Sequence, residues 1–350
     1  MTGDYVGLRE LERFCRAAFL ASGANEATAV AATRSMMHGT RFGVDSHGVR
    51  LLPHYIKALE GGRLNCNPEP RKVGGFGAVE VLDADHAQGA LGGYTGMERA
   101  VELARQFGLG AVAIRNNSHF GPAGAYSLAA AEAGFIGISF CNSDSFVRLH
   151  DGAARFHGTN PISVAVPTPG GDPWFLDMAT SSIPYNRVLL YRSLGQDLPD
   201  SVASDPTGRD VTDPQLVDML APLGGAFGFK GAALGGVAEI FSAVLTGMKL
   251  SFDILPMDGP DFATPRQMGA FMLALNPEAF LDRDQFHAGM SRYVESLRNS
   301  PAREGCRVMA PGDREWDVAR DRERNGVPLD PTTAQHFHEL ARRFDIAPVA

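Results

Sequence analysis

The sequence predicts a mixed α/β fold with a helical lobe at its N-terminus. Two observations lead to this prediction. Apolar residues over residues 6–39 recur at the three- and four-residue spacing of helices. From about residue 70, strand-like runs alternate with helix-like segments, as in mixed α/β architectures. No internal repeat, low-complexity segment or Pro- or Ser-rich linker divides the 350 residues, so we expect one interlocked body.

The N-terminal lobe is expected to contain three helices. The first helical pattern ends at Gly23, and a second helix is expected to begin near Asn25, because the segment Asn-Glu-Ala-Thr precedes an Ala-rich run. A third helix is expected over residues 45–59, where Pro53 introduces a kink or an interruption. We place the boundary of this lobe at residues 1–70.

The next part, residues 71–310, is expected to be a mixed α/β body that binds cofactor and substrate. Expected strands cover residues 79–83, 110–115, 136–141, 161–167, 174–178 and 269–274. Expected helices cover residues 94–107, 123–133, 231–248 and 283–298, and residues 185–250 are expected to be mostly helical. The last part, residues 311–350, begins with a charged stretch, becomes helical over 332–344, and is expected to pack back on the body.

Composition argues against several classes of protein. Hydrophobic residues make up 44% of the chain and charged residues 21%, as in ordinary globular proteins. The net charge is −8 and no basic stripe is present, so a nucleic-acid partner is not expected. No uncharged apolar run reaches the ~20 residues that span a bilayer. Early acidic residues at 4, 10 and 12 argue against a signal peptide.

The four cysteines, Cys15, Cys66, Cys141 and Cys306, are far apart and form no CxxC pair. Neither a zinc finger nor a disulfide framework is therefore expected. Reduced cysteines are typical of a cytoplasmic protein, which is the location we expect.

Neither common nucleotide-binding fingerprint is present. Residues 108–113 match GxGxxA, but they follow an expected helix and precede a strand, which is the reverse of the Rossmann order. We interpret them as a helix-ending turn. Residues 225–230 lack the spacing of a Walker A motif and the Ser or Thr after its lysine.

His119 lies in Asn-Asn-Ser-His-Phe-Gly, between an expected strand and an expected helix. Side chains at this end of a sheet often carry the chemistry of α/β proteins, and a histidine can move a proton near neutral pH. The alternative is a structural histidine that caps the helix or holds the loop.

On a continuous helix, His47, Arg50 and His54 would share one face. Such a face could bind a small carboxylate, or it could simply be a solvated basic surface. No metal is expected, because the spacing of the two histidines is wider than in a helical zinc site and no acidic residue completes it.

Two further segments could meet a phosphate. Residues 177–182 end an expected strand with hydroxyls and backbone N–H groups, an arrangement that also suits a helix N-cap. Lys230 precedes the helix expected over 231–248, where a positive side chain is unfavourable unless an anion binds. A plain exposed lysine is the alternative.

Taken together, these segments resemble the malate/L-lactate dehydrogenase family, which lacks a Rossmann fold and includes sulfolactate, ureidoglycolate and diketogulonate enzymes. The resemblance runs in order along nearly the whole chain. Its motifs are Ser46-His47-Gly48, Asn117-Ser118-His119, Cys141-Asn142-Ser143, Gly158-Thr159-Asn160-Pro161, Asp177-Met178-Ala179-Thr180, Phe229-Lys230-Gly231 and Pro311-Gly312.

The resemblance implies a non-Rossmann NAD(P)-binding fold of the sulfolactate dehydrogenase type, and a homodimer with the active site near the interface. It implies His119 as the acid/base on the substrate oxygen. His47 matches the histidine that acts as the proton donor in some members and is the alternative, and Ser46 helps His47 to orient the oxygen. NAD or NADP is the implied cofactor. The positions that match cofactor contacts are Ser143, Asp177, Met178, Ala179, Thr180, Ser181, Ser182, Phe229, Lys230, Gly312, Asp313 and Arg314.

The sequence departs from this family at the expected substrate site. Many relatives have an arginine three residues after the glycine of Ser-His-Gly, but here that position is Leu51 and the arginine is Arg50. Arg50, Arg148 or His54 could therefore hold the substrate carboxylate. A second departure is Leu-His-Asp-Gly at residues 149–152, where relatives show Pro-x-Gly-Gly.

We therefore expect a hydride-transferring oxidoreductase that acts on a small 2-oxo or 2-hydroxy acid, such as malate or lactate. A reductase of cyclic imino acids is the alternative within the same chemistry. An alternative of another class is a catalytically inactive nucleotide-binding protein, although the presence of both His47 and His119 argues against it.

Overall fold

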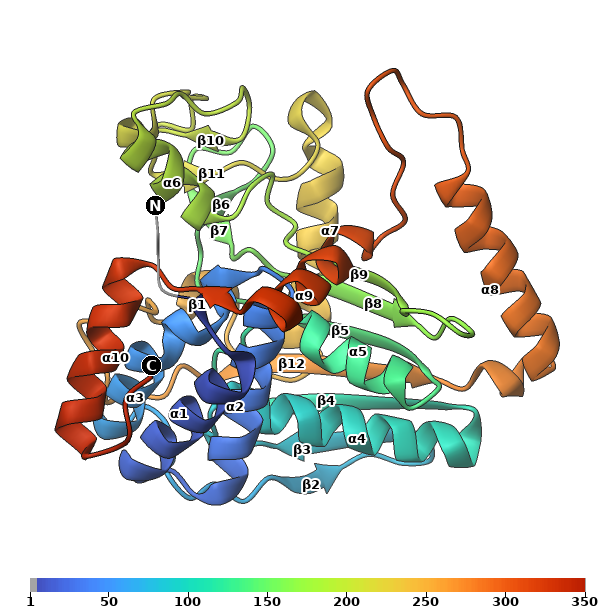
Figure 1. The fold of residues 1–350 in the computed structure, drawn as a ribbon, viewed down its shortest axis with the longest axis horizontal. Coiled ribbons are helices and arrows are strands. Elements are labelled where there is room, and N and C mark those ends of the chain that lie inside the picture. Colours follow the sequence, from blue (N-terminus) through green and yellow to red (C-terminus); the bar gives the residue numbers. More distant parts are fainter. Residues whose placement is uncertain (1–4, 350) are drawn as a thin grey trace.

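A seven-stranded sheet forms the centre of the computed structural model, which describes residues 5–349 (Figure 1). Its order is β2-β3-β4-β12-β5-β8-β9. Within this sheet β3 and β4 are parallel and every other neighbouring pair is antiparallel. The strands are β2 (Arg71–Gly74), β3 (Val79–Asp83), β4 (Leu109–Asn117), β5 (Ile136–Cys141), β8 (Ile162–Val166), β9 (Trp174–Met178) and β12 (Met268–Leu275). The mixed α/β prediction and all six expected strands are confirmed.

The central strand β12 comes from late in the chain and inserts between β4 and β5. Residues 270–275 pair with β4 on one side and with β5 on the other. Because β12 has neighbours on both edges and is covered on both faces, its sequence is a nearly continuous apolar run, Met-Gly-Ala-Phe-Met-Leu-Ala-Leu.

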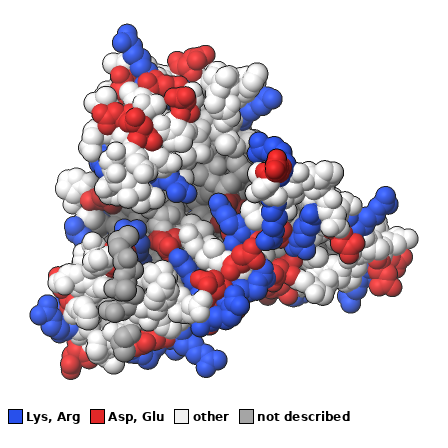
Figure 2. Space-filling view, turned by 45° about the horizontal axis from the view of Figure 1, so that its top comes forward, with Lys and Arg blue, Asp and Glu red and all other residues white. Residues whose placement is uncertain are grey.

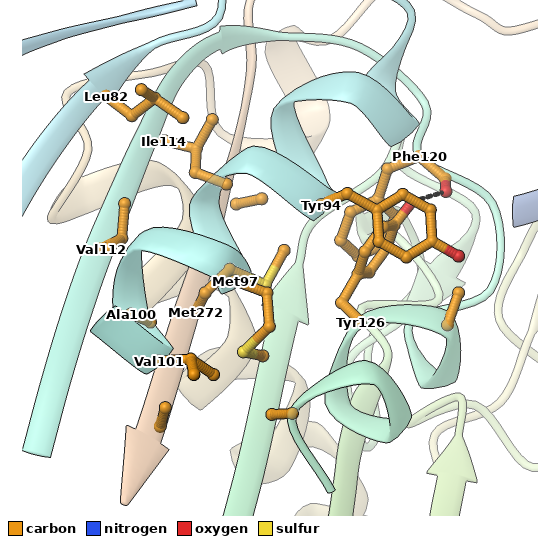
Figure 3. Close-up of a cluster of buried hydrophobic side chains, with 14 of the residues drawn as sticks. Leu82, Tyr94, Met97, Ala100, Val101, Val112, Ile114, Phe120, Tyr126 and Met272 are labelled. Atoms are coloured by element: carbon orange, nitrogen blue, oxygen red, sulfur yellow. Dashed lines mark hydrogen bonds between the residues drawn. The ribbon is translucent and has the colours of Figure 1, made fainter. Parts of the chain in front are cut away.

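Helices cover both faces of the sheet. On one face lie α4 (Gly89–Phe107) and α5 (Gly124–Glu132). On the other lie α7 (Phe229–Glu239) and the π-helix η5 (Ile240–Val244). Figure 3 shows the core between α4 and the sheet, where Tyr94, Phe120 and Tyr126 pack side by side at one end. The Tyr126 hydroxyl donates to the Phe120 carbonyl, so this core also holds the loop after β4.

The N-terminal helices are α1 (Leu8–Ala21), α2 (Glu26–Arg41) and α3 (Leu52–Glu60). Asn25 caps α2 as expected, because its side chain accepts a hydrogen bond from the Thr28 N–H. The last helix, α10 (Pro331–Phe344), packs against this lobe, with the rings of Phe14 and Phe337 4.9 Å apart. Strand β1 (Tyr5–Val6) pairs with β13 (Val327–Pro328). The two ends of the chain thus share one core, while the domain boundaries at 70 and 310 stay a prediction.

A small sheet of order β10-β11-β6-β7 and helix α6 (Tyr185–Leu194) form the upper lobe in Figure 1. Its strands are β6 (Val147–Arg148), β7 (Arg155–His157), β10 (Ala203–Ser204) and β11 (Met219–Leu220). The helix α8 (Arg283–Arg298) stands at the opposite edge of the molecule. Short 3-10 turns are η3 (Pro214–Leu216), η4 (Gly225–Phe227), η6 (Ser251–Asp253) and η7 (Pro277–Ala279).

The third expected helix is wrong over its first half. Two 3-10 turns, η1 (Asp45–His47) and η2 (Val49–Leu51), precede α3, because the extended backbone at Gly48 breaks the helix. Pro53 lies in the first turn of α3, where its missing N–H costs no hydrogen bond. His47, Arg50 and His54 therefore do not share one continuous helix face.

Three other predictions about helices also need correction. Residues 195–228 are mostly irregular with short strands, since their apolar side chains pack under the small sheet rather than along helix faces. The charged stretch after residue 312 forms the helix α9 (Asp313–Asn325), which is stabilised by ion pairs such as that between Arg298 and Asp313. The helix expected over 231–248 begins at Phe229 and changes to π-helix at Ile240.

Gly108 ends α4 in the left-handed conformation, with φ 84°, which confirms that the GxGxxA segment is a helix-ending turn. Among the described residues, no helix is both long and apolar enough to cross a membrane. None of the four cysteines is paired.

Candidate active site

A pocket of about 630 Å³ lies where the ends of β4, β5 and β9 approach the small upper lobe. Figure 2 shows the surface hollowed between this lobe and the body, with Lys and Arg side chains near the rim. The structure brings five of the predicted site residues to the pocket wall: Ser46, His47, His119, Ser143 and Ala179. Its size is in the usual range for ligand pockets.

His119 reaches the pocket from the loop between β4 and α5, as the sequence predicts. The first residue of α4, Gly89, lies tightly against this loop: a Cβ atom there would be 2.4 Å from the carbonyl oxygens of Ser118 and His119. The Asn117 side chain donates to the Gly89 carbonyl over 3.2 Å. The backbone that carries His119 is therefore held by the N-terminus of α4.

His47 reaches the pocket from the 3-10 turn η1, and its Nδ1 lies 2.8 Å from the Ser46 hydroxyl. Gly48 has no room for a side chain, because a Cβ would lie 2.5 Å from the Thr40 hydroxyl oxygen. That oxygen accepts a hydrogen bond from the Val49 N–H. Close packing against α2 thus explains the glycine of the Ser-His-Gly motif.

The C-terminal part of the chain supports the same turn. Arg322 of α9 is buried and pairs with both carboxylate oxygens of Asp45, at 2.6 and 2.9 Å. It also donates to the Thr40 carbonyl. A bidentate arginine fixes both position and orientation of the carboxylate.

The rings of His47 and His119 stack with their centroids 5.6 Å apart. Burial lowers the pKa of His47 to about 4. Burial also lowers the pKa of His119 well below its usual range, and the charges of His47 and Arg266 lower it further. Both imidazoles are therefore neutral near pH 7, and each can accept a proton.

A family model described as malate/L-lactate dehydrogenase matches residues 6–338.

The chain belongs to the malate/L-lactate dehydrogenase family.

Curated relatives support this membership. The chain is 33% identical to malate dehydrogenase from Pyrococcus abyssi over 312 residues, which cover 87% of the chain and 85% of that protein. It is 33% identical to (2R)-3-sulfolactate dehydrogenase (NADP(+)) from Chromohalobacter salexigens, over 91% of the chain and 92% of the relative. These relatives are dehydrogenases of hydroxy acids, and this chain is such an oxidoreductase, with NAD or NADP as its cofactor.

The fold agrees with the family. The malate dehydrogenase structure from Entamoeba histolytica matches with a TM-score of 0.93 at 28% identity, over 99% of both chains. The sulfolactate dehydrogenase structure from Methanocaldococcus jannaschii matches with a TM-score of 0.91, also at 28% identity, over 98% of both chains. The predicted non-Rossmann fold of the sulfolactate dehydrogenase type is thus confirmed.

The turn at residues 177–182, which the resemblance assigns to the cofactor, reaches the pocket wall through Ala179. Its hydroxyls are used within the protein: Thr180 donates to the Thr159 carbonyl over 3.1 Å, and Ser182 donates to the Pro222 carbonyl over 2.8 Å. The Ser181 hydroxyl donates to a carbonyl in the same turn. The backbone N–H groups of Thr180 and Ser182 also donate within the protein, to the Thr159 and Ala221 carbonyls over 2.9 Å each. These groups therefore shape the turn that brings Ala179 to the pocket wall.

Asp177 and Met178 end β9, and burial raises the pKa of Asp177 to about 7. The Asp177 carboxylate accepts a hydrogen bond from the Gly124 N–H over 3.0 Å. Asp177 therefore ties the end of β9 to the start of α5, the helix that follows the His119 loop.

Phe229 and Lys230 form the first turn of α7 and do not line the pocket. The Lys230 ammonium lies 5.4 Å from the Phe227 ring centroid, and within residues 5–349 no carboxylate pairs with it. An unpaired cation at a helix N-terminus suits an anion such as a phosphate. Lys230 could therefore meet a phosphate outside the pocket wall.

Residues 312–314, which were also predicted to contact the cofactor, lie at the start of α9 and outside the pocket wall. Gly312 precedes α9 with φ 95° and packs against Phe175 of β9. Asp313 is buried and pairs with Arg298 at 2.6 Å, whereas Arg314 is exposed and pairs with its neighbour Glu315. Neither charged side chain of this segment faces the pocket.

The structure does not bring the predicted substrate cations to the pocket. Arg50 is half exposed and lies 3.4 Å from Asp330. Arg148 is buried, and its guanidinium pairs with Asp210 at 2.6 Å. His54 packs against the Phe262 ring, with centroids 5.7 Å apart. Each of these side chains already has a partner elsewhere in the fold.

Sequence reasoning missed several residues of the pocket wall, among them Asp144, Ser145, Arg155, Asn186, Ser251 and Asp258. It also missed Tyr55, whose hydroxyl lies 2.8 Å from Nδ1 of His119. Asp144 and Ser145 could have been predicted from the sequence, because they directly follow Ser143 at the end of β5. The others come from segments that are distant along the chain.

Proposed function

We propose that this enzyme interconverts a small 2-oxo acid and the matching 2-hydroxy acid, and that His119 transfers the proton of the substrate oxygen. When bound, the nicotinamide of NAD or NADP accepts or supplies the hydride at C2 of the acid. The observation that carries the proposal is the stacked pair of neutral histidines in a pocket of dinucleotide-binding proportions.

The roles of the side chains follow from their contacts. His119 uses Nδ1 to bind the Tyr55 hydroxyl, which leaves Nε2 for the substrate oxygen. His47 uses Nδ1 to bind Ser46, so its Nε2 is also available to orient that oxygen. Positioning together with acid/base help supplies the rate. A bound carboxylate would raise the pKa of His119, so the anionic substrate itself favours proton uptake.

The substrate carboxylate needs a cation. Among the described residues that line the pocket, Arg155 is the one arginine and no lysine is present. Its side chain is 42% exposed and pairs with Asp218 at 2.9 Å. We propose Arg155 for carboxylate binding in place of Arg50 and Arg148, because Arg155 lines the pocket whereas the other two arginines pair with acids away from its wall.

We also propose a homodimer in which a second copy covers the outer face of α7 and η5. Ile240 and Val244 there are 56% and 63% exposed. Phe229, Leu234, Val237 and Leu245 add further exposed apolar area. Apolar surface of this extent is typical of permanent interfaces. The neighbouring Phe252 lines the pocket, so this face would place the interface near the active site.

For location we propose the cytoplasm. All four cysteines are unpaired, and Cys306 is exposed. An exposed free thiol suits a reducing compartment.

The test measures NADH and NADPH oxidation with a panel of 2-oxo acids and cyclic imines. His119→Asn should lower kcat by about 10²–10⁴-fold and leave the cofactor Kd nearly unchanged. Arg155→Met should raise the KM of the acid with little effect on the cofactor. Lys230→Ala, as the matched comparison, should weaken cofactor binding and leave the KM of the acid nearly unchanged.

Each outcome decides a separate point. Unchanged turnover in His119→Asn would remove His119 from the chemistry. Turnover of cyclic imines but not of oxo acids would establish the imine-reductase alternative. Cofactor binding without turnover of any compound would favour the inactive binding protein.

A further inference from the structure

Tyr55 of α3 contacts the His119 ring on its buried side. Its side chain is 2% exposed, and its hydroxyl lies 2.8 Å from Nδ1 of His119. The two ring centroids are 5.9 Å apart. A buried hydroxyl needs an acceptor for its proton, so the direction of this hydrogen bond is determined by the other groups around Tyr55.

Gln88, just before α4, holds the loop that carries His119. Its Oε1 accepts a hydrogen bond from the Ala90 N–H over 2.8 Å, and its NH₂ group lies 3.5 Å from the His119 carbonyl oxygen. Within residues 5–349, the Tyr55 hydroxyl has no partner at hydrogen-bond distance besides Nδ1 of His119.

The proton of Tyr55 must then go to His119. Within residues 5–349, Nδ1 of His119 is the acceptor within hydrogen-bond distance of this hydroxyl. Burial raises the pKa of Tyr55 far above its usual range, so the hydroxyl keeps its proton. Nδ1 therefore accepts through its lone pair, and a neutral His119 carries its own proton on Nε2. Within residues 5–349, Nε2 of His119 has no hydrogen-bond partner. Because His119 lines the pocket, this N–H is available to a bound substrate.

We propose that Tyr55 is a positioning residue that holds His119 in its Nε2–H tautomer and aims that N–H into the pocket. The inference rests on the proposed function, in which His119 acts on the substrate oxygen. A carbonyl oxygen accepts a hydrogen bond from such an N–H, whereas the lone pair of the other tautomer would repel it. In the free enzyme this N–H orients the carbonyl oxygen of a 2-oxo acid. The proton of the reduction is available once Nδ1 has taken up a proton from solvent, because the imidazolium can then give its Nε2 proton to the oxygen and return to the neutral ring.

A phenol suits this task better than a carboxylate does. A carboxylate beside Nδ1 would favour the charged imidazolium and raise the pKa of the histidine. Besides burial, the groups that act on His119 are His47, Arg266 and His54, and all of them lower its pKa. A hydroxyl can donate to the neutral ring and, after rotation, accept from the imidazolium, so Tyr55 can follow His119 through both charge states.

The tautomer is measured directly by NMR on the full-length enzyme labelled with ¹⁵N-histidine, without substrate or cofactor. Long-range ¹H–¹⁵N correlations distinguish the two tautomers, and the His119 signals are assigned as those missing in His119→Asn. The test variant is Tyr55→Phe, which removes one buried oxygen. The matched control is Tyr94→Phe, which removes another buried hydroxyl of the same core, away from His119.

In the wild type and in Tyr94→Phe, we expect His119 in the Nε2–H form. In Tyr55→Phe we expect a mixture of both tautomers and a kcat for reduction that is about 10–100-fold lower, with the cofactor Kd unchanged. An unchanged tautomer in folded Tyr55→Phe, or an Nδ1–H form in the wild type, would overturn the proposal. Because the NMR measurement needs no turnover, it separates this result from a failure of the proposed function, which the turnover of His119→Asn decides.

Discussion

At the scale of single residues, the site combines two histidines with unusually low pKa values, and within residues 5–349 no carboxylate pairs with either ring. His47 and His119 come from η1 and from the loop after β4, and the fold stacks them in a mostly buried position. Burial is the main reason for both low pKa values, since removing water disfavours the charged ring. The neutral form of His119 therefore persists well into the acidic range.

This property predicts the pH dependence of hydroxy-acid oxidation, for which His119 must be neutral and must change to its Nδ1–H tautomer so that Nε2 can accept a proton. A histidine with the ordinary pKa of about 6.5 would lose roughly tenfold in kcat/KM between pH 7.5 and 5.5. Because the pKa of His119 is lowered, we expect a change of less than about twofold over that range. Tautomer balance does not depend on pH, so it does not alter the shape of the profile.

The measurement is kcat/KM for oxidation in the free enzyme, with circular dichroism at each pH as the control for folding. A tenfold fall toward pH 5.5 in protein that remains folded would contradict a lowered pKa.

Residue identities in the site were only partly predictable. His47 and His119 could be found because short motifs and the nearby strand and helix pattern mark them. Tyr55 could not be found in the same way, because its role depends on a contact with a residue 64 positions away. Arg50 and Arg148 looked suitable from their types alone, and the sequence does not reveal that acids at positions 330 and 210 pair with them.

At the scale of elements, the junction between α7 and η5 organises the floor of the site. Glu239, the last residue of α7, is buried and accepts hydrogen bonds from three residues. Ser251 donates its N–H and its hydroxyl over 2.6 Å each, Asn160 donates over 2.7 Å, and Asn142 over 3.3 Å. Ser251 lines the pocket, so one carboxylate connects α7, the end of β5 and the pocket wall.

Glu239→Gln tests this junction. The new NH₂ group would face donors and lose at least one of these hydrogen bonds, so we expect a loss of about 1–3 kcal/mol in stability. The thermal-unfolding midpoint should fall by several degrees at a fixed scan rate. Glu132→Gln, at an exposed position of α5, is the control and should shift stability by less than about 0.5 kcal/mol. Equal midpoints for the two variants would show that Glu239 does not hold the elements together.

At the scale of the whole molecule, one large apolar surface is left uncovered. The outer face of α7 and η5 is exposed, although the other side of the same helices packs on the sheet. The helix α8 also stands away from the body, with Val294 as its single buried residue (Figure 1). A chain with such surfaces is expected to associate.

The prediction for assembly uses two acidic substitutions on that face, Ile240→Asp together with Val244→Asp. We expect the wild type at about twice 37.4 kDa in light scattering after size exclusion, and the double variant at the monomer mass. Phe76→Asp, which changes an 86% exposed ring at the turn between β2 and β3, should remain a dimer. A double variant that stays dimeric would move the interface elsewhere, with α8 as the next candidate.

The sequence by itself determined six of the seven strands of the central sheet, the mixed α/β class, the family and the two histidines, because each of these depends on local periodicity or on short motifs in order. It was wrong where tertiary packing overrides local pattern. The extended backbone at Gly48, which packs against α2, interrupts the helix expected over residues 45–59, so that α3 begins just before Pro53. Ion pairs stabilise the charged helix α9.

Only the tertiary structure decided which groups share the pocket and which partners they have. Strand β12 inserts between β4 and β5, the C-terminal helices support the turn that carries His47, and Tyr55 meets His119. Hydrogen bonds and ion pairs act over about 3 Å. The chemistry of a side chain therefore depends on neighbours that the fold supplies from distant parts of the chain.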